Sequence, residues 1–140
     1  MNTNSRTFDR PDRKTILSTL WVFLAANYIY CDVLSHMEPA ALQELITGKV
    51  GSIQVTQVFL LSAAIMMEIP FVMIVLSRVL KYRANRWANI IAGTTMAAIQ
   101  IGTMNMGTPP TLHYLFYSAI EVVCSLFVVW YAWKWTGLEG

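Results

Sequence analysis

Four long apolar runs dominate the chain, and only small or single polar residues interrupt them. They cover approximately residues 16–34, 55–80, 87–106 and 112–133. A helix needs about 20 mostly apolar residues to cross the hydrocarbon core of a bilayer, and it satisfies its own backbone polar groups there. The pattern therefore predicts an all-α polytopic membrane protein. Its four transmembrane helices would form one bundle within a membrane domain at 15–136, after a polar tail at 1–14.

The segment between the first two runs has a pattern of its own. Glu38 and Pro39 resemble a helix start, and Gly48 suits a helix stop. The apolar residues between them would share one helix face; they are Leu42, Leu45 and Ile46. We expect a short amphipathic helix in the first external loop, where it could act as a lid. A plain connector is the alternative for a loop of this length.

Composition supports the membrane assignment. Hydrophobic residues make up 56% of the chain and charged residues 13%, whereas soluble domains carry about 25% charged residues. This excludes a soluble enzyme with a large core, a DNA-binding module and a disulfide-stapled secreted domain. The two cysteines, Cys31 and Cys124, are expected as unpaired core residues.

The positions of the basic residues predict the orientation. Of the 10 Lys and Arg residues, most lie in the tail or in the second loop: Arg6, Arg10, Arg13, Lys14, Arg78, Lys81, Arg83 and Arg86. Because positive residues near helix ends stay on the cytoplasmic side, both termini are predicted to be cytoplasmic. The run from Arg78 to Arg86 would also attract anionic lipid headgroups.

Each predicted helix has one face on which polar, small or aromatic residues recur about every 3.5 positions. Such a face is expected to point inward in a left-handed bundle. The four inward faces are, in chain order, Ser18, Trp21, Ala25, Tyr28, Asp32 and Ser35; Leu61, Ala64, Glu68, Phe71 and Val75; Asn89, Gly93, Met96, Gln100 and Thr103; and Tyr114, Tyr117, Glu121, Cys124 and Val128.

Three carboxylates within the spans are the candidate site residues, since intramembrane acids are costly and usually face an interior or a wet cavity. Helix rise places Glu68 and Glu121 near mid-membrane, level with Gln100, and places Asp32 near the outer mouth together with Asn105. Glu68 and Glu121 are predicted to share one interior, which Gln100 and Tyr117 would line.

No basic residue lies at the depth of these acids, so each would bind a proton or a cation. Pro70 would free the carbonyl of Met66 beside Glu68. The alternative is that the two glutamates act only as interhelical hydrogen-bonding groups.

A metal site is a weaker possibility. Asp32 and His36 are four residues apart on one helix face, and His113 begins the last span on the same side of the membrane. Such a set can bind zinc or copper, but the chain has no established metal motif. We expect neither a metal nor a cofactor.

Several segments resemble a family of small bacterial four-helix membrane proteins of unknown function. They are Asn27–Asp32, Gly48–Leu61, Ile69–Arg78, Asn85–Ile90 and Glu121–Lys134. The resemblance covers nearly all of the chain after the tail. It implies four membrane helices and a multi-pass protein of the bacterial inner membrane, and it implies no activity.

These features favour transport or conduction of a proton, a cation or a small cationic solute, with Glu68 and Glu121 as binding groups. A chain with four helices has little room for a complete pathway, so a homo-oligomer, most simply a dimer, is expected. Two alternatives remain open. The chain could be a membrane enzyme or lipid binder that uses the two glutamates as an acid–base pair, or an accessory subunit of a membrane complex.

Overall fold

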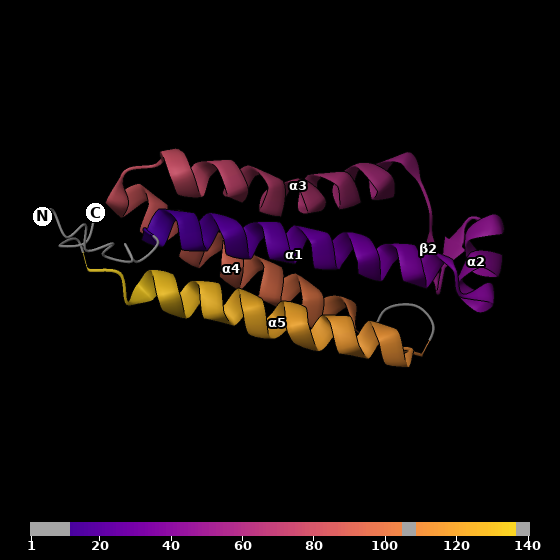
Figure 1. Cartoon of the computed structure of the whole chain (residues 1–140). Helices are drawn as coiled ribbons and strands as arrows, with labels where there is room; N and C mark the ends of the chain where they lie inside the picture. Colours follow the sequence, from indigo (N-terminus) through magenta and orange to yellow (C-terminus); the bar gives the residue numbers. More distant parts are fainter. Residues whose placement is uncertain (1–11, 105–108, 137–140) are drawn as a thin grey trace, which may run out of the picture.

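The computed structural model describes residues 12–104 and 109–136 and is predominantly helical (Figure 1). Its elements, in order, are α1 (Arg13–His36), α2 (Pro39–Ile46), β1 (Lys49–Val50), β2 (Ile53–Gln54), α3 (Gln57–Val79), α4 (Tyr82–Thr103) and α5 (Leu112–Trp133). The all-α expectation is confirmed. Helix α4 begins at Tyr82, five residues before Trp87, where the third span was predicted to begin, because the basic segment after α3 is already helical.

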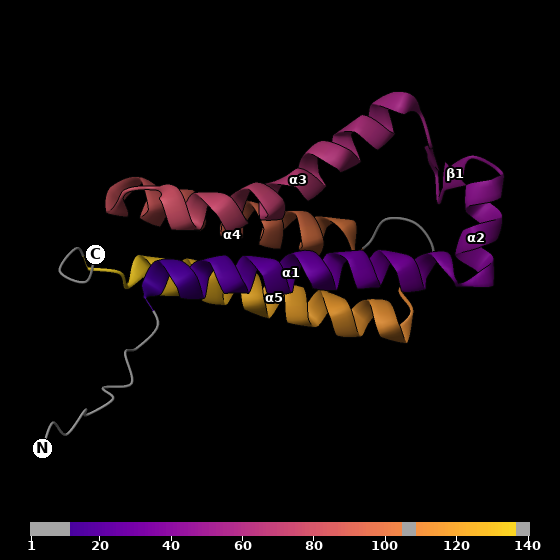
Figure 2. The same cartoon turned by 45° about the horizontal axis from the view of Figure 1, so that its top comes forward.

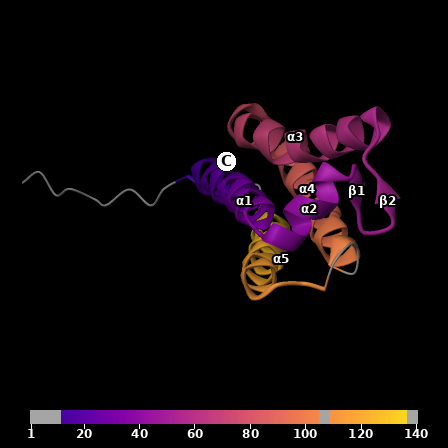
Figure 3. The same ribbon diagram turned by 90° about the vertical axis from the view of Figure 1, so that its right-hand side faces the viewer.

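The four long helices form a bundle in which α1 contacts α3 and α5, while α4 contacts α5 and α3 (Figure 3). The start of α1 and the end of α5 lie at the same end, where the Arg13 guanidinium donates to the Tyr131 carbonyl at 3.3 Å. We call this the basic end, because it also carries Arg78, Arg83, Arg86 and Lys134. The opposite end, capped by α2 and the hairpin, is called the pocket end (Figure 1).

Local sequence accounts for the elements at the pocket end. The helix predicted after Glu38 is present as α2, with Pro39 at its first position. Gly48 follows it at φ +74°, a conformation that favours glycine. The β1–β2 hairpin was not expected from the sequence, although a two-residue Gly51-Ser52 turn between β-branched residues is a hairpin signal. Only Gly51 has positive φ in that turn, which fits a type II′ geometry.

Three of the helices, α1, α3 and α5, are long and apolar enough to cross a membrane. The remaining predicted span, the third at 87–106, corresponds to α4, which has 22 residues, as α5 does. It is not among the three because its sequence is more polar.

The core confirms three of the four predicted inward faces. Trp21 and Tyr28 of α1, Asn89 and Met96 of α4, and Val128 of α5 are all buried. The predicted face of α3 is wrong, because all five of its residues are exposed: Leu61, Ala64, Glu68, Phe71 and Val75. This helix instead buries Pro70, Met73 and Ser77. Since α3 is apolar on every side, hydrophobicity does not mark the face that packs.

A buried layer of polar side chains joins three helices in the half of the bundle nearer the basic end. The Trp21 indole N–H donates to Asn89 Oδ1 at 2.7 Å, and the Ser77 hydroxyl donates to the same oxygen at 3.3 Å. The Asn89 amide donates to Asn85 Oδ1 at 2.7 Å, and the Asn85 amide donates to the Ser77 carbonyl at 2.6 Å. These groups satisfy one another without water, which is what a low-dielectric interior requires.

Small residues allow α4 and α5 to approach closely. A Cβ atom added at Gly93 would lie 2.8 Å from Val129 Cγ2 and 3.1 Å from the Ser125 carbonyl oxygen. The position therefore needs glycine for packing rather than for a special backbone conformation.

Candidate functional site

A cavity with a volume of about 400 Å³ lies at the pocket end. Its walls come from the end of α1, from α2 and the hairpin, from the first half of α3 and from the start of α5. Figure 2 shows why there is space here, since α3 bends near its middle and its first half leans away from the other helices. Pro70 is the fourteenth of the 23 residues of α3 and accounts for the bend.

Acidic side chains are concentrated in the lining of this cavity. Asp32 of α1, Glu38 before α2 and Glu44 within α2 all contribute to it, together with His36. Among the residues that the structure describes, the lining contains neither Lys nor Arg. The Glu44 carboxylate already has one hydrogen-bond partner, because its Oε2 accepts from the Gly51 N–H at 2.8 Å.

The rest of the lining is mainly apolar and includes two aromatic residues. Phe59 of α3 and Tyr114 of α5 supply rings, and Leu45, Ile53 and Met66 supply aliphatic or thioether surface. The cavity thus combines carboxylates with apolar and aromatic walls. This combination suits a cation that carries apolar groups, because ring faces attract cations and apolar walls remove its hydrocarbon surface from water.

Glu121 lies deeper, in the packed interior of the bundle. Its side chain is 1% exposed, and neither carboxyl oxygen has a hydrogen-bond partner. The buried hydroxyls of Tyr28 and Ser125 also lack partners, and Tyr28 lies within electrostatic range of Glu121 and beside Ser125. The interior position predicted for Glu121 is confirmed.

Glu68 does not join Glu121 in a shared interior, so that expectation is wrong. Its side chain is exposed on the outward face of α3, with Ala64 and Val72 one turn away on either side. The reason is the reversed face of α3 described above: the helix turns Pro70 and Met73 toward the bundle, which places Glu68 on the other side.

The remaining predicted residues fall into several groups. The Gln100 amide donates to the Ser118 hydroxyl at 2.7 Å, so it links α4 to α5. Tyr117 is half-buried, with its ring edge against Phe116 at 5.6 Å between centroids. Met66, whose carbonyl loses its helical partner to Pro70, lines the cavity. Asn105 lies outside the described residues.

The histidines do not assemble a metal centre in the part of the chain that the structure describes. No group of three or more His, Cys, Asp or Glu side chains is placed there to hold an ion. His113 instead lies 3.4 Å from the Ser35 hydroxyl through Nε2, and 3.0 Å from the Thr111 hydroxyl through Nδ1. His36 lines the acidic cavity. The alternative of a metal bound by Asp32, His36 and His113 therefore has no support in the structure.

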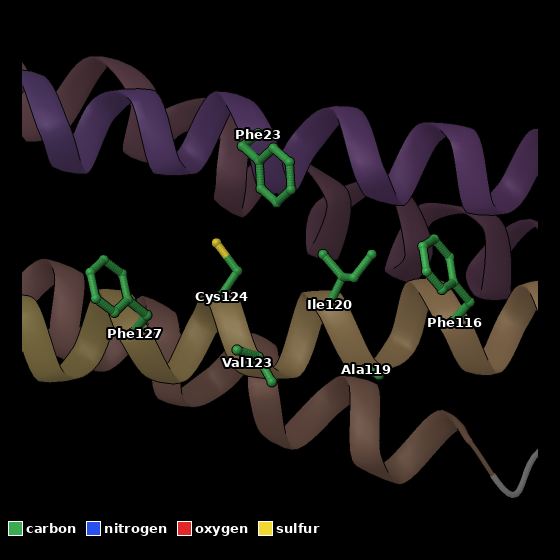
Figure 4. Close-up of a pocket in the computed structure, with 7 residues that line it drawn as sticks. All are labelled: Phe23, Phe116, Ala119, Ile120, Val123, Cys124 and Phe127. Carbon is green, nitrogen blue, oxygen red and sulfur yellow. The ribbon is translucent and has the colours of Figure 1, made fainter.

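A second, shallower hollow lies between α1 and α5. Figure 4 shows Phe23 of α1 facing the α5 residues Ile120 and Cys124, between Phe116 and Phe127. All seven of its lining residues are apolar. It is open to the outside of the bundle, and its chemistry matches that of the surrounding apolar surface.

Sequence reasoning does not assign Glu38 and Glu44 to the site. The pattern marks Glu38 only as part of a helix start and gives Glu44 no role. The signal that could have found them is the amphipathic pattern of α2, in which Ala41, Glu44 and Leu45 fall on one side and line the cavity. That α2 folds back over the end of α1 depends on the turn at Met37 and Glu38, which local pattern does not specify.

Comparison with known proteins gives a family without an assigned activity. Residues 7–139 match the model of the family of unknown function DUF6326. The chain belongs to this family. No match was found among curated proteins or among solved structures. The DUF6326 chain is thus helical, with helices that can span a membrane, and its activity has to be inferred from its own residues.

Proposed function

We propose that this DUF6326 protein is a four-span membrane protein that binds a small organic cation in the acidic cavity and transports it. The observation that carries the proposal is the composition of the cavity. It holds Asp32, Glu38 and Glu44 together with His36 and two aromatic rings, and no Lys or Arg among the described residues, in a volume of about 400 Å³. Ligand pockets for drug-sized molecules begin at roughly 300 Å³.

The proposal of four spans rests on how α4 packs. Its polar residues Asn85, Asn89 and Gln100 are buried and hydrogen-bonded to other side chains or backbone groups. Its outward residues include Trp87, Ile91 and Ile101, all more than half exposed. The helix is therefore polar inside and apolar outside, which is the distribution that a bilayer requires even when mean hydropathy is low.

The two ends of the bundle differ in charge, which supports one orientation. The basic end carries Arg78, Lys81, Arg83 and Arg86 on or beside α3 and α4, whereas the pocket end carries Asp32, Glu38 and Glu44. By the positive-inside rule, the basic end faces the cytoplasm and the cavity opens to the outer face. The basic end would also contact anionic lipids. From the family resemblance we also propose that this membrane is the inner membrane of a bacterium.

The outward position of Glu68 supports a homodimer. A carboxylate facing lipid at mid-membrane is costly, by roughly 2.5–3.5 kcal/mol on insertion scales. A second copy of α3 would cover it, with the small residue Ala64 one turn away allowing close approach. A partner subunit of another kind would serve the same purpose, which is the accessory-subunit alternative.

The enzyme alternative loses its basis, because it required Glu68 and Glu121 to act on one substrate. One lies outside the bundle and the other inside it. We do not propose it.

The proposed cation site is tested by ligand binding to purified protein in detergent. Benzyltrimethylammonium is the probe, and neopentylbenzene, in which carbon replaces the charged nitrogen, is its neutral control. We expect the cation to bind at least tenfold more tightly, a difference of about 1.4 kcal/mol. Asp32→Asn should remove that preference, because a carboxylate about 4 Å from a cation contributes up to about 4 kcal/mol at an effective dielectric near 20.

Glu68→Gln is the matched control, since it removes a carboxylate that lies outside the cavity. It should bind the cation as the wild type does. Uptake of the same cation into liposomes then distinguishes a transporter from a binding protein. Equal affinity for the cation and its neutral control, or full binding by Asp32→Asn, would refute the cation site.

A further inference from the structure

The interior around Glu121 contains several polar atoms that have no partner. Both Glu121 carboxyl oxygens, the Tyr28 hydroxyl and the Ser125 hydroxyl are inaccessible and make no hydrogen bond. Unpartnered buried polar groups are rare in native proteins and call for a physical explanation. Here they come from two neighbouring helices, α1 and α5, and they surround one acid.

A charged carboxylate is the costliest of these groups, so its charge has to be neutralised by a proton or a cation. The residues that face it supply no positive charge. From α1 these are Tyr28, Cys31 and Asp32, and from α5 itself the thiol of Cys124 and the hydroxyls of Ser118 and Ser125. The ionisable residues of α4, namely Tyr82, Arg83 and Arg86, all lie in its first two turns at the basic end.

A proton fits this position better than a metal ion. The carboxyl and hydroxyl oxygens have essentially no accessible surface, whereas an ion with its coordination shell needs space. A neutral carboxyl group also becomes a hydrogen-bond donor, and the hydroxyls of Tyr28 and Ser125 can each accept or donate by rotation. Protonation therefore removes the buried charge and gives Glu121 a donor in an interior whose neighbouring groups carry no positive charge.

The buried acid is connected to the cavity through α1 and α5. Asp32 lines the cavity and lies within electrostatic range of Glu121. Tyr114 also lines the cavity and precedes Glu121 by two helical turns, or roughly 10 Å along the axis. Ser118, whose hydroxyl binds Gln100, lies between them. A charge placed at Asp32 would therefore change the electrostatic field at Glu121.

We propose that Glu121 holds one exchangeable proton and releases it when an organic cation binds beside Asp32. This inference rests on the proposed cation site. In the step, the carboxyl O–H bond breaks, its electron pair stays on the carboxylate, and the proton passes to water in the cavity. One positive charge enters as another leaves, so the net charge of the site is unchanged. The bound cation stabilises the new carboxylate, which couples the two events.

The proton on Glu121 is tested first and without a ligand. Infrared spectra of the wild type and of Glu121→Gln, recorded at pH 7, give a difference spectrum that isolates this residue. We expect the band of a neutral carboxyl group in the wild type only. A carboxylate band in its place would overturn the proposal. Glu68→Gln is the control and should not remove the neutral band assigned to Glu121.

The exchange is tested by proton release. Benzyltrimethylammonium has no ionisable proton, so any proton that appears in weakly buffered solution comes from the protein. We expect about one proton per bound cation in the wild type, and none in Glu121→Gln, which should still bind the cation.

The outcomes separate the two proposals. Cation binding without proton release would refute the exchange and leave the cation site intact. Absence of cation binding to the wild type would refute the cation site and the exchange together, while the infrared measurement would still decide the protonation of Glu121.

Discussion

Replacement of Asn89 by Leu should remove the centre of the buried polar layer. Asn89 accepts from Trp21 at 2.7 Å and from Ser77 at 3.3 Å, and it donates to two oxygens of Asn85 at 2.7 and 2.9 Å. Hydrogen bonds between membrane helices average about 0.6 kcal/mol. Only the bonds from Trp21 and Ser77 join Asn89 to other helices, so they give an expected loss of about 1.2 kcal/mol in the free energy of unfolding, since Leu fills a similar volume.

The Trp21–Asn89 bond itself is isolated by a double-mutant cycle with Trp21→Phe. Unfolding in mixed micelles of dodecyl maltoside and SDS, followed by far-ultraviolet circular dichroism, gives the four free energies. The coupling should be about 1 kcal/mol, within the roughly 0.6–1.7 kcal/mol measured for such pairs. A second cycle pairs Trp21→Phe with Ser118→Ala, which shares no hydrogen-bond partner with Trp21, and should be additive. Additivity within about 0.3 kcal/mol in the first cycle as well would refute the bond.

Three further predictions concern packing, backbone conformation and topology. Gly93→Ala should destabilise the bundle by about 1–3 kcal/mol, because its Cβ would meet Val129. Gly102→Ala is the control, because a Cβ there has nothing within 4 Å, and it should be neutral or stabilising by up to about 1 kcal/mol in the same micelle assay. Gly48→Ala should cost about 1–2 kcal/mol because φ is +74°, and Gly48→Asn should cost less; equal losses would contradict the conformational explanation. In intact cells, an impermeant maleimide should label Met37→Cys, at the outer face, and should label Lys134→Cys, at the cytoplasmic face, only after lysis. The two native cysteines are buried and should give little background. Labelling of both positions from outside would exclude four spans with this orientation.

The sequence is informative where a helix has one distinctive face. On α1, α4 and α5, polar and small residues alternate with exposed apolar ones, so the pattern alone assigns Trp21, Asn89 and Glu121 to the interior, where they lie. On α3 apolar residues lie on every side, and the polar residues Ser62, Glu68 and Ser77 do not share one face. The pattern therefore predicts that this acid points inward, whereas the helix buries Pro70 and Met73 instead.

The site is predictable only in part, for a related reason. The intramembrane position of Asp32 marks it as a candidate, and it does line the cavity. Glu38 and Glu44 lie outside the apolar runs, where charged residues are ordinary, so nothing in their composition distinguishes them. Their role depends on the turn between α1 and α2, which brings α2 over the cavity, and this is a tertiary feature.

The bend at Pro70 gives the two halves of α3 different neighbours. The second half is tied to the bundle, because the Ser18 hydroxyl donates to the Ile74 carbonyl at 2.9 Å and Ser77 joins the polar layer. The first half borders the cavity and is largely exposed. Amide hydrogens of residues 57–69 should consequently exchange with solvent deuterium faster than those of residues 71–79 wherever water reaches them. In mechanical terms, α3 resembles a lever that is fixed to the bundle at the basic end, and movement of its first half about Pro70 would change the volume of the cavity at the pocket end.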